Sequence, residues 1–148
     1  TMGYGLPAAM GVQVAHPDAM VVGVSGEGSF MMNMQELATI VQYRLPVKVM
    51  ILNNFSLGMV RHWQELLHGS RYSESSMESF LDFVKMAEAF GMKGLRVTKL
   101  SEMDAILEEM LAHDGPVLVD LHVDPKENVF PMIPSGKGLS EMILAKDE

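Results

Sequence analysis

Two apolar runs, each followed at once by a turn that carries oxygen ligands, constrain the fold of this chain most strongly. The runs cover residues 20–24 and 47–52, and the first is apolar on both faces, as expected of a buried strand in a parallel sheet. The first run leads into the segment 26–30, Gly-Glu-Gly-Ser-Phe, and the second leads into an Asn-Asn pair. Because the carboxyl ends of parallel strands meet at one edge of a sheet, we expect Glu27 and Asn54 to face each other there.

This pair of side chains predicts a specific chemistry. Carboxylate and amide oxygens are ligands that suit Mg²⁺, and a backbone carbonyl such as that of Ser56 would serve as a third ligand. Exposed N–H groups beside glycines suit a phosphate. Together they predict a site for a metal-bridged diphosphate. Plainer explanations remain open at this point: Glu27 as a solvated turn carboxylate, and the Asn pair as ordinary turn chemistry.

The pattern along the chain predicts an α/β fold, a mostly parallel sheet flanked by helices. Strands alternate with helices, and the commonest nucleotide-binding loop motifs, the P-loop and the dinucleotide fingerprint, are absent. We expect a turn over 25–29, an N-cap at Asn33, a C-cap at Gly91 and a capping box formed by Ser101 and Asp104. The predicted strands cover 20–24, 47–52, 95–97 and 117–123, and the predicted helices cover 6–15, 33–43, 58–67, 80–90 and 101–113.

Composition excludes several classes of function. The 148 residues suit one domain, and the formal net charge of −8, with scattered basic residues, argues against a nucleic-acid partner. No apolar run is long enough to predict a membrane span, and the absence of cysteine excludes disulfides and thiolate metal sites. We therefore expect a cytoplasmic protein without a membrane partner. Because the chain begins at Thr1 inside a glycine-rich segment, we also expect it to be a fragment of a longer polypeptide.

Longer segments of the chain resemble the thiamine-diphosphate-dependent enzymes, whose motif pairs Gly-Asp-Gly with a downstream Asn-Asn. Within that family the sequence is most similar to the large catalytic subunits of acetolactate synthase, also called acetohydroxyacid synthase. The resemblance covers nearly the whole chain and implies that 1–148 is the C-terminal thiamine-diphosphate-binding domain of a three-domain chain, with 124–148 as its tail. The similar segments are 1–9, 35–39, 45–48, 51–54, 57–61, 63–66, 71–73 and 130–136.

The resemblance implies a role for each residue of the metal and diphosphate site. Glu27, Asn54 and the backbone of Ser56 would hold Mg²⁺, while Gly28 and Ser29 would donate N–H bonds to the diphosphate. The family has Asp at the position of Glu27. Because Mg²⁺ demands a near-ideal octahedron at short distances, we expect the longer side chain to weaken Mg²⁺ affinity while the site is retained. Alternatively, the loop would adjust to the longer side chain, or the site would accept a less demanding ion such as Mn²⁺ or Ca²⁺.

The resemblance also implies how the rest of the cofactor and the substrate are held. Met2 and Met59 would flank the two rings of the cofactor, with Gly58 beside them, and Trp63 would line the substrate entrance, where the family selects the second 2-keto acid. Ordinary packing is the alternative explanation for the methionines and for the tryptophan.

The implied activity joins pyruvate, after decarboxylation, to a second 2-keto acid, giving acetolactate or acetohydroxybutyrate for branched-chain amino acid biosynthesis. The implied cofactors are thiamine diphosphate and Mg²⁺, with FAD on another domain of the full-length protein. The resemblance places the activating glutamate in an absent N-terminal domain, so we expect no catalytic residue and no activity in this chain alone. Expected partners are further subunits in a homodimer or tetramer, and a regulatory subunit. Another 2-keto acid decarboxylase or carboligase, or a non-catalytic relic, are the alternatives.

Overall fold

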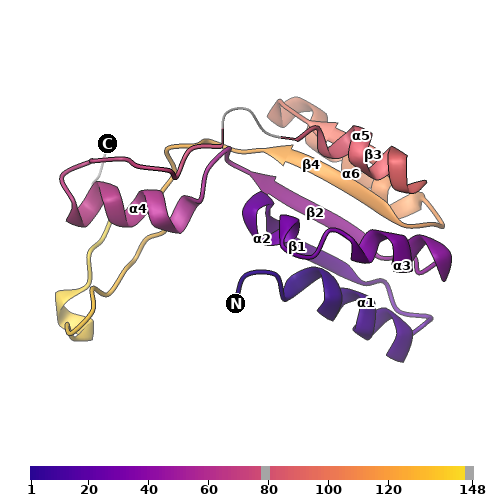
Figure 1. Cartoon of the computed structure of the whole chain (residues 1–148), viewed down its shortest axis with the longest axis horizontal. Coiled ribbons are helices and arrows are strands. Elements are labelled where there is room, and N and C mark those ends of the chain that lie inside the picture. Colours follow the sequence, from indigo (N-terminus) through magenta and orange to yellow (C-terminus); the bar gives the residue numbers. More distant parts are fainter. Residues whose placement is uncertain (78–80, 146–148) are drawn as a thin grey trace.

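The computed structural model describes residues 1–77 and 81–145, and it contains a four-stranded sheet with helices on both sides (Figure 1). All neighbouring strands are parallel, and their spatial order is β1-β2-β4-β3. This confirms the predicted α/β class. The strands are β1 (Val22–Gly26), β2 (Lys48–Asn53), β3 (Lys93–Val97) and β4 (Val117–His122).

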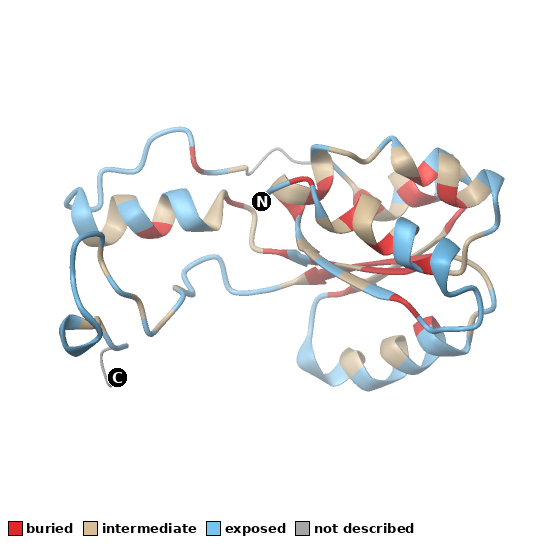
Figure 2. Ribbon diagram, turned by 90° about the horizontal axis from the view of Figure 1, so that it is seen from below, coloured by how far each residue is buried: buried red, intermediate tan, exposed pale blue. Residues whose placement is uncertain are grey.

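Two hydrophobic layers hold the sheet between its helices. On one face lie α1 (Gly5–Ala15), α2 (Glu27–Met31), α3 (Glu36–Gln42) and α5 (Phe83–Phe90), and on the other lies α6 (Met103–Ala112). Figure 2 shows α6 alone below the sheet and the other helices that cover the sheet above it.

The central strand β2 explains why both layers form. Val49 and Ile51 point into the larger core, whereas Met50 packs in the smaller one, which follows from the alternation of side chains along a strand. In β4, Leu118 joins the larger core and Val119 the smaller one. Strands that are buried on both faces carry mostly apolar residues, and this is why the sequence pattern predicted them.

A second region projects from the carboxyl end of the strands (Figure 1). It contains α4 (Gly58–Leu67) and the tail, which includes a 3₁₀ turn at Leu139–Glu141, labelled η2. Asn128 of the tail accepts a bond from Arg61 at 3.4 Å and donates one to Glu65 at 3.0 Å. The first part of the predicted tail, 124–148, is therefore attached to α4. The last three residues of the tail lie outside the described ranges.

The turn predicted over 25–29 is wrong. Ser25 and Gly26 belong to β1, because they continue its parallel pairing with β2 as far as Leu52. Glu27 then opens α2 directly. The strand is thus shifted by two residues from its predicted range, and Glu27 sits at the start of a helix.

Two predicted caps are also wrong. Asn33 does not cap a helix, because α3 begins three residues later and the Asn33 amide instead donates to the Gly3 carbonyl at 2.7 Å. At the predicted capping box of Ser101 and Asp104, a 3₁₀ turn, η1 (Leu100–Glu102), precedes α6. There Glu102 is the capping acid, and it accepts N–H bonds from the two residues at positions 98 and 99.

The C-cap at Gly91 is confirmed, with a left-handed φ of 84° that favours glycine. The predicted start of that helix, Phe80, lies outside the described residues, and α5 begins at Phe83 after the N-cap Asp82. Within residues 1–77 and 81–145, no helix has the length and apolarity needed to cross a bilayer.

Candidate functional site

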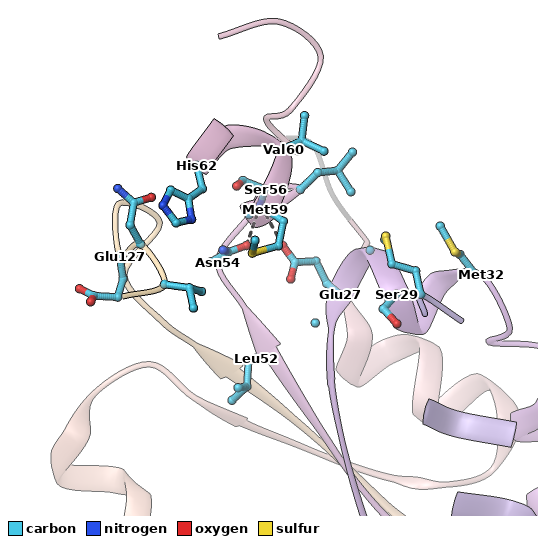
Figure 3. Close-up of a pocket in the computed structure, with 17 residues that line it drawn as sticks. Glu27, Ser29, Met32, Leu52, Asn54, Ser56, Met59, Val60, His62 and Glu127 are labelled. Atoms are coloured by element: carbon cyan, nitrogen blue, oxygen red, sulfur yellow. Dashed lines mark hydrogen bonds between the residues drawn. The ribbon is translucent and has the colours of Figure 1, made fainter. Parts of the chain in front are cut away.

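A pocket of about 400 Å³ lies where the carboxyl edge of the sheet meets α4 (Figure 3). Its walls come from the segment before α1, the start of α2, the loop after β2, the first turns of α4 and the first part of the tail. The lining residues are Met2, Gly26, Glu27, Gly28, Ser29, Met32, Leu52, Asn54, Ser56, Leu57, Gly58, Met59, Val60, His62, Glu127, Asn128 and Val129.

The two predicted metal ligands converge inside this pocket. Glu27 is only 2% exposed, and its Oε1 accepts the backbone N–H of Ser56 at 2.9 Å. The Oδ1 atom of Asn54 accepts the same N–H at 3.1 Å. Because both oxygens reach one donor, the structure brings the carboxylate and the amide together, and Figure 3 shows this junction.

Burial of the carboxylate changes its electrostatics. Desolvation raises the pKa of Glu27, and the nearby charge of Asp120 acts in the same direction. Backbone N–H groups of residues 27, 54 and 56 oppose that shift only in part. A buried carboxylate of this kind gains from a bound cation, which supplies the compensating charge that burial has removed.

The neighbouring Asn53 has a structural role. Its amide donates to the buried Asp120 carboxylate at 3.0 Å, and Asp120 also binds Arg96 at 3.0 Å. Asn53 Oδ1 accepts the N–H of Phe55 at 3.2 Å, and Phe55 has a left-handed φ of 56°. This turn directs the N–H of Ser56 back toward Glu27. Of the Asn-Asn pair, the second residue is the one that faces the pocket.

Two glycines keep the pocket open. A Cβ added at Gly28 would lie 2.7 Å from the Leu57 side chain, and one added at Gly58 would lie 2.7 Å from Nδ2 of Asn54. At contacts this short the neighbouring side chain would have to move, so glycine at each position permits the observed packing. Ser29 accepts the Gly3 N–H through its hydroxyl at 3.0 Å. The N–H groups of Gly28 and Ser29 lie in the first turn of α2, where no intrahelical partner exists.

Eight of the nine residues singled out from the sequence line this one pocket, and the exception is Trp63. Met2 and Met59 contribute to its wall and are 49% and 53% exposed, so their roles toward a cofactor stay predictions. Trp63 is 41% exposed and does not line the pocket. Its predicted place at a substrate entrance is not tested by this arrangement.

Sequence reasoning missed the part of the pocket contributed by α4 beyond Met59 and by the tail. His62 is 1% exposed, and its ring meets the Phe130 ring at 65° with 5.5 Å between centroids. The one available signal was spacing: His62 follows Met59 by three residues, which places both on one helix face. The tail segment 127–129 carried no signal, because its approach to α4 depends on long-range bonds.

The donor set fits a hard divalent cation. In the part of the chain that the structure describes, no group of three or more His, Cys, Asp or Glu side chains is placed to hold a metal. A site here must therefore combine the Glu27 carboxylate with an amide and a backbone oxygen, a set that Mg²⁺ accepts. The Ser56 hydroxyl is buried without a hydrogen-bond partner among the described residues, which leaves a further oxygen beside Asn54 and Glu27.

Comparison with known proteins places this chain in a defined family. The family model described as "Thiamine pyrophosphate enzyme, C-terminal TPP binding domain" matches residues 1–121. The chain therefore belongs to this family of cofactor-binding domains. This confirms the resemblance predicted from the sequence.

Among individual proteins, the chain is similar to large subunits of acetolactate synthase. The chain is 52% identical to the acetolactate synthase large subunit of Porphyra purpurea over 144 residues, which are 97% of this chain and 24% of the relative. It is 49% identical to the acetolactate synthase isozyme 2 large subunit of Escherichia coli K12 over 143 residues, 97% of this chain and 26% of the relative. The chain spans about a quarter of the length of these relatives.

A solved structure shares the fold. The thiamine diphosphate-dependent 4-hydroxybenzoylformate decarboxylase of Rhodococcus jostii RHA1 matches with a TM-score of 0.77 and 33% sequence identity. The match covers 83% of this chain and 23% of that chain. The name of this decarboxylase refers to thiamine diphosphate, in agreement with the family of cofactor-binding domains to which the chain belongs.

Proposed function

We propose that this chain supplies the diphosphate and metal half of the active site of an acetolactate synthase. The complete enzyme would condense pyruvate with a second 2-keto acid to acetolactate or acetohydroxybutyrate, in branched-chain amino acid biosynthesis. Identity of 52% and 49% to acetolactate synthase large subunits supports this activity. The observation that carries the site is the convergence of Glu27 and Asn54 on one N–H at the sheet edge.

The residues of this chain would hold the cofactor and the metal ion. Glu27, Asn54 and the backbone at Ser56 would bind Mg²⁺, and the N–H groups of Gly28 and Ser29 would bind the diphosphate. When bound, thiamine diphosphate supplies the carbanion chemistry, and the protein supplies position and electrostatics.

The apolar wall of the pocket would then orient the organic part of the cofactor. Met2 and Met59 would pack on its rings, with Gly58 leaving room at the start of α4. Leu57 lies against Gly28 and would exclude water from that side. Trp63 would act further out, at the substrate entrance.

The remaining parts of the enzyme would come from outside this chain. We propose that the glutamate that activates the cofactor lies on another domain, that FAD binds elsewhere in the full-length protein, and that a cytoplasmic homodimer or tetramer, with a regulatory subunit, is the working form. On this basis the 148-residue chain alone has no activity. Acetolactate formation by the purified chain would contradict that.

The test is an assay of the complete polypeptide for acetolactate from pyruvate, with thiamine diphosphate and Mg²⁺, in the presence and absence of a chelator. Formation of acetolactate that the chelator abolishes is the expected result. A protein that binds the cofactor but forms no acetolactate contradicts the proposed reaction while keeping the cofactor site.

A second function has a specific observation in its favour. The 0.77 TM-score to a 4-hydroxybenzoylformate decarboxylase shows that this fold also serves a decarboxylase. Release of an aldehyde from a 2-keto acid, without a condensation product, would favour that function. No cofactor binding at all would favour a non-catalytic relic.

A further inference from the structure

His62 is a buried polar side chain without a hydrogen-bond partner in the part of the chain that the structure describes. It is 1% exposed, and neither Nδ1 nor Nε2 has a partner among the described residues. In either tautomer a neutral imidazole carries one N–H donor and one acceptor. Leaving both unpaired in a buried position is unfavourable, so such a ring usually has a partner that belongs to a ligand or to ordered water.

His62 lies on the part of α4 that forms a wall of the pocket. The residue lies on α4 four positions after Gly58 and three after Met59, so all three share one face of the helix. Gly58, at the start of this face, lies next to the Asn54 amide. His62 lies about 6 Å from Gly58 along the helix axis. His62 itself lines the pocket, and Figure 3 shows its ring on the side of Asn54.

Apolar groups contribute to the surroundings of the ring. The Phe130 ring packs edge-on against the imidazole, and Val60 and Val129 line the same pocket. The acidic residue of this rim, Glu127, is exposed, and in Figure 3 its carboxylate points away from the imidazole ring. The N–H of His62 is therefore a donor that no neighbouring carboxylate among the described residues uses.

We propose that His62 donates a hydrogen bond to an anionic oxygen of a ligand in this pocket. Two ligands of the proposed enzyme carry such oxygens: thiamine diphosphate, through its diphosphate, and the 2-keto acid, through its carboxylate. The inference rests on the proposed function. It assigns to His62 a binding role beside the Glu27 and Asn54 site.

Three variants of the complete polypeptide separate a binding role from a packing role. His62→Phe removes both nitrogens and keeps a ring against Phe130, whereas His62→Gln restores a donor. His68→Phe is the matched control, because His68 is an exposed histidine at the end of the same helix.

The readouts are calorimetric binding of thiamine diphosphate and of inorganic diphosphate, each with Mg²⁺, the KM for pyruvate, and the melting temperature of the ligand-free protein. We expect His62→Phe to weaken the binding of one of these ligands by about 10- to 100-fold. We expect His62→Gln to recover most of the lost affinity. The ligand-free melting temperature of His62→Phe should be unchanged or higher, since an unpaired polar group has been replaced by an apolar ring.

The pattern of loss identifies the source of the oxygen. Weaker binding of both diphosphate ligands assigns it to the cofactor, while a raised KM for pyruvate with normal cofactor affinity assigns it to the substrate carboxylate. Unchanged affinity and KM in His62→Phe would overturn the inference. An equal loss of affinity in His62→Phe and His62→Gln, together with an equal fall in melting temperature, would also overturn it, because it would indicate a packing role. A wild-type protein that binds no thiamine diphosphate would overturn the proposed function itself, and the inference with it.

Discussion

Substitution of Gly58 by alanine offers a sharp test of the metal site. The added Cβ would lie 2.7 Å from Nδ2 of Asn54, and an ordinary contact needs at least 3.4 Å. The amide must therefore retreat by roughly 0.7 Å. Mg²⁺ holds its ligands at about 2.0–2.1 Å in a near-ideal octahedron, so a displacement of this size removes the Asn54 oxygen from coordination.

The expected result is a loss of metal-dependent binding without a loss of fold. We expect Gly58→Ala to lower the affinity for thiamine diphosphate at limiting Mg²⁺ by about 10- to 100-fold, the usual effect of disturbing a metal ligand's support. This corresponds to about 1.4 to 2.8 kcal/mol. Stability should be little changed, because alanine favours a helix over glycine by about 1 kcal/mol and the displaced atom is a side-chain end.

Gly11→Ala is the matched control. Gly11 lies inside α1, and a Cβ added there would meet no other part of the described chain within 4 Å. We expect this variant to gain up to about 1 kcal/mol of stability without a change in affinity. Calorimetric titration and thermal unfolding measure both quantities. Wild-type affinity in Gly58→Ala would refute the placement of Asn54 as a metal ligand.

Three further predictions test other parts of the account. Glu27→Asp should raise Mg²⁺ affinity, since it restores the shorter carboxylate of the family; an unchanged Mg²⁺ requirement in a cofactor titration would disprove the weakening assigned to Glu27. Asp82→Asn should lower the melting temperature at pH 7 by an amount worth less than about 1 kcal/mol. The N–H of Lys85 and the Arg96 guanidinium lower the pKa of Asp82, so its contribution is present above about pH 4 and is lost as the pH falls through the folded pKa; an undiminished difference at pH 2 would contradict this. Trp63→Phe should leave cofactor affinity unchanged, because Trp63 lies outside the pocket, while it alters the choice of the second 2-keto acid in competition assays.

The sequence predicted most of the sheet because its central strands are buried on both faces. The runs at 47–52 and 117–123 fall within one residue of β2 and β4. The first strand was placed two residues early, because its carboxyl end carries Ser25 and Gly26, which resemble a turn until pairing with Leu52 is known. Local pattern alone cannot report a pairing partner.

The site was predictable where chemistry is local and unpredictable where it depends on long-range contacts. Glu27 and Asn54 follow two strands directly, so parallel pairing was enough to bring them together. The burial of His62 depends on Phe130, 68 positions later, and on the bonds that hold the tail against α4. Nothing in the residues around His62 signals that approach.

The most direct test of the central claim is calorimetric binding of thiamine diphosphate to the complete polypeptide, with Mg²⁺, with chelator, and after Asn54→Ala. The account predicts binding that requires Mg²⁺ and that Asn54→Ala weakens by at least about tenfold. Equal binding with and without the metal ion, or wild-type affinity in the Asn54 variant, would contradict a metal-bridged diphosphate at this edge of the sheet.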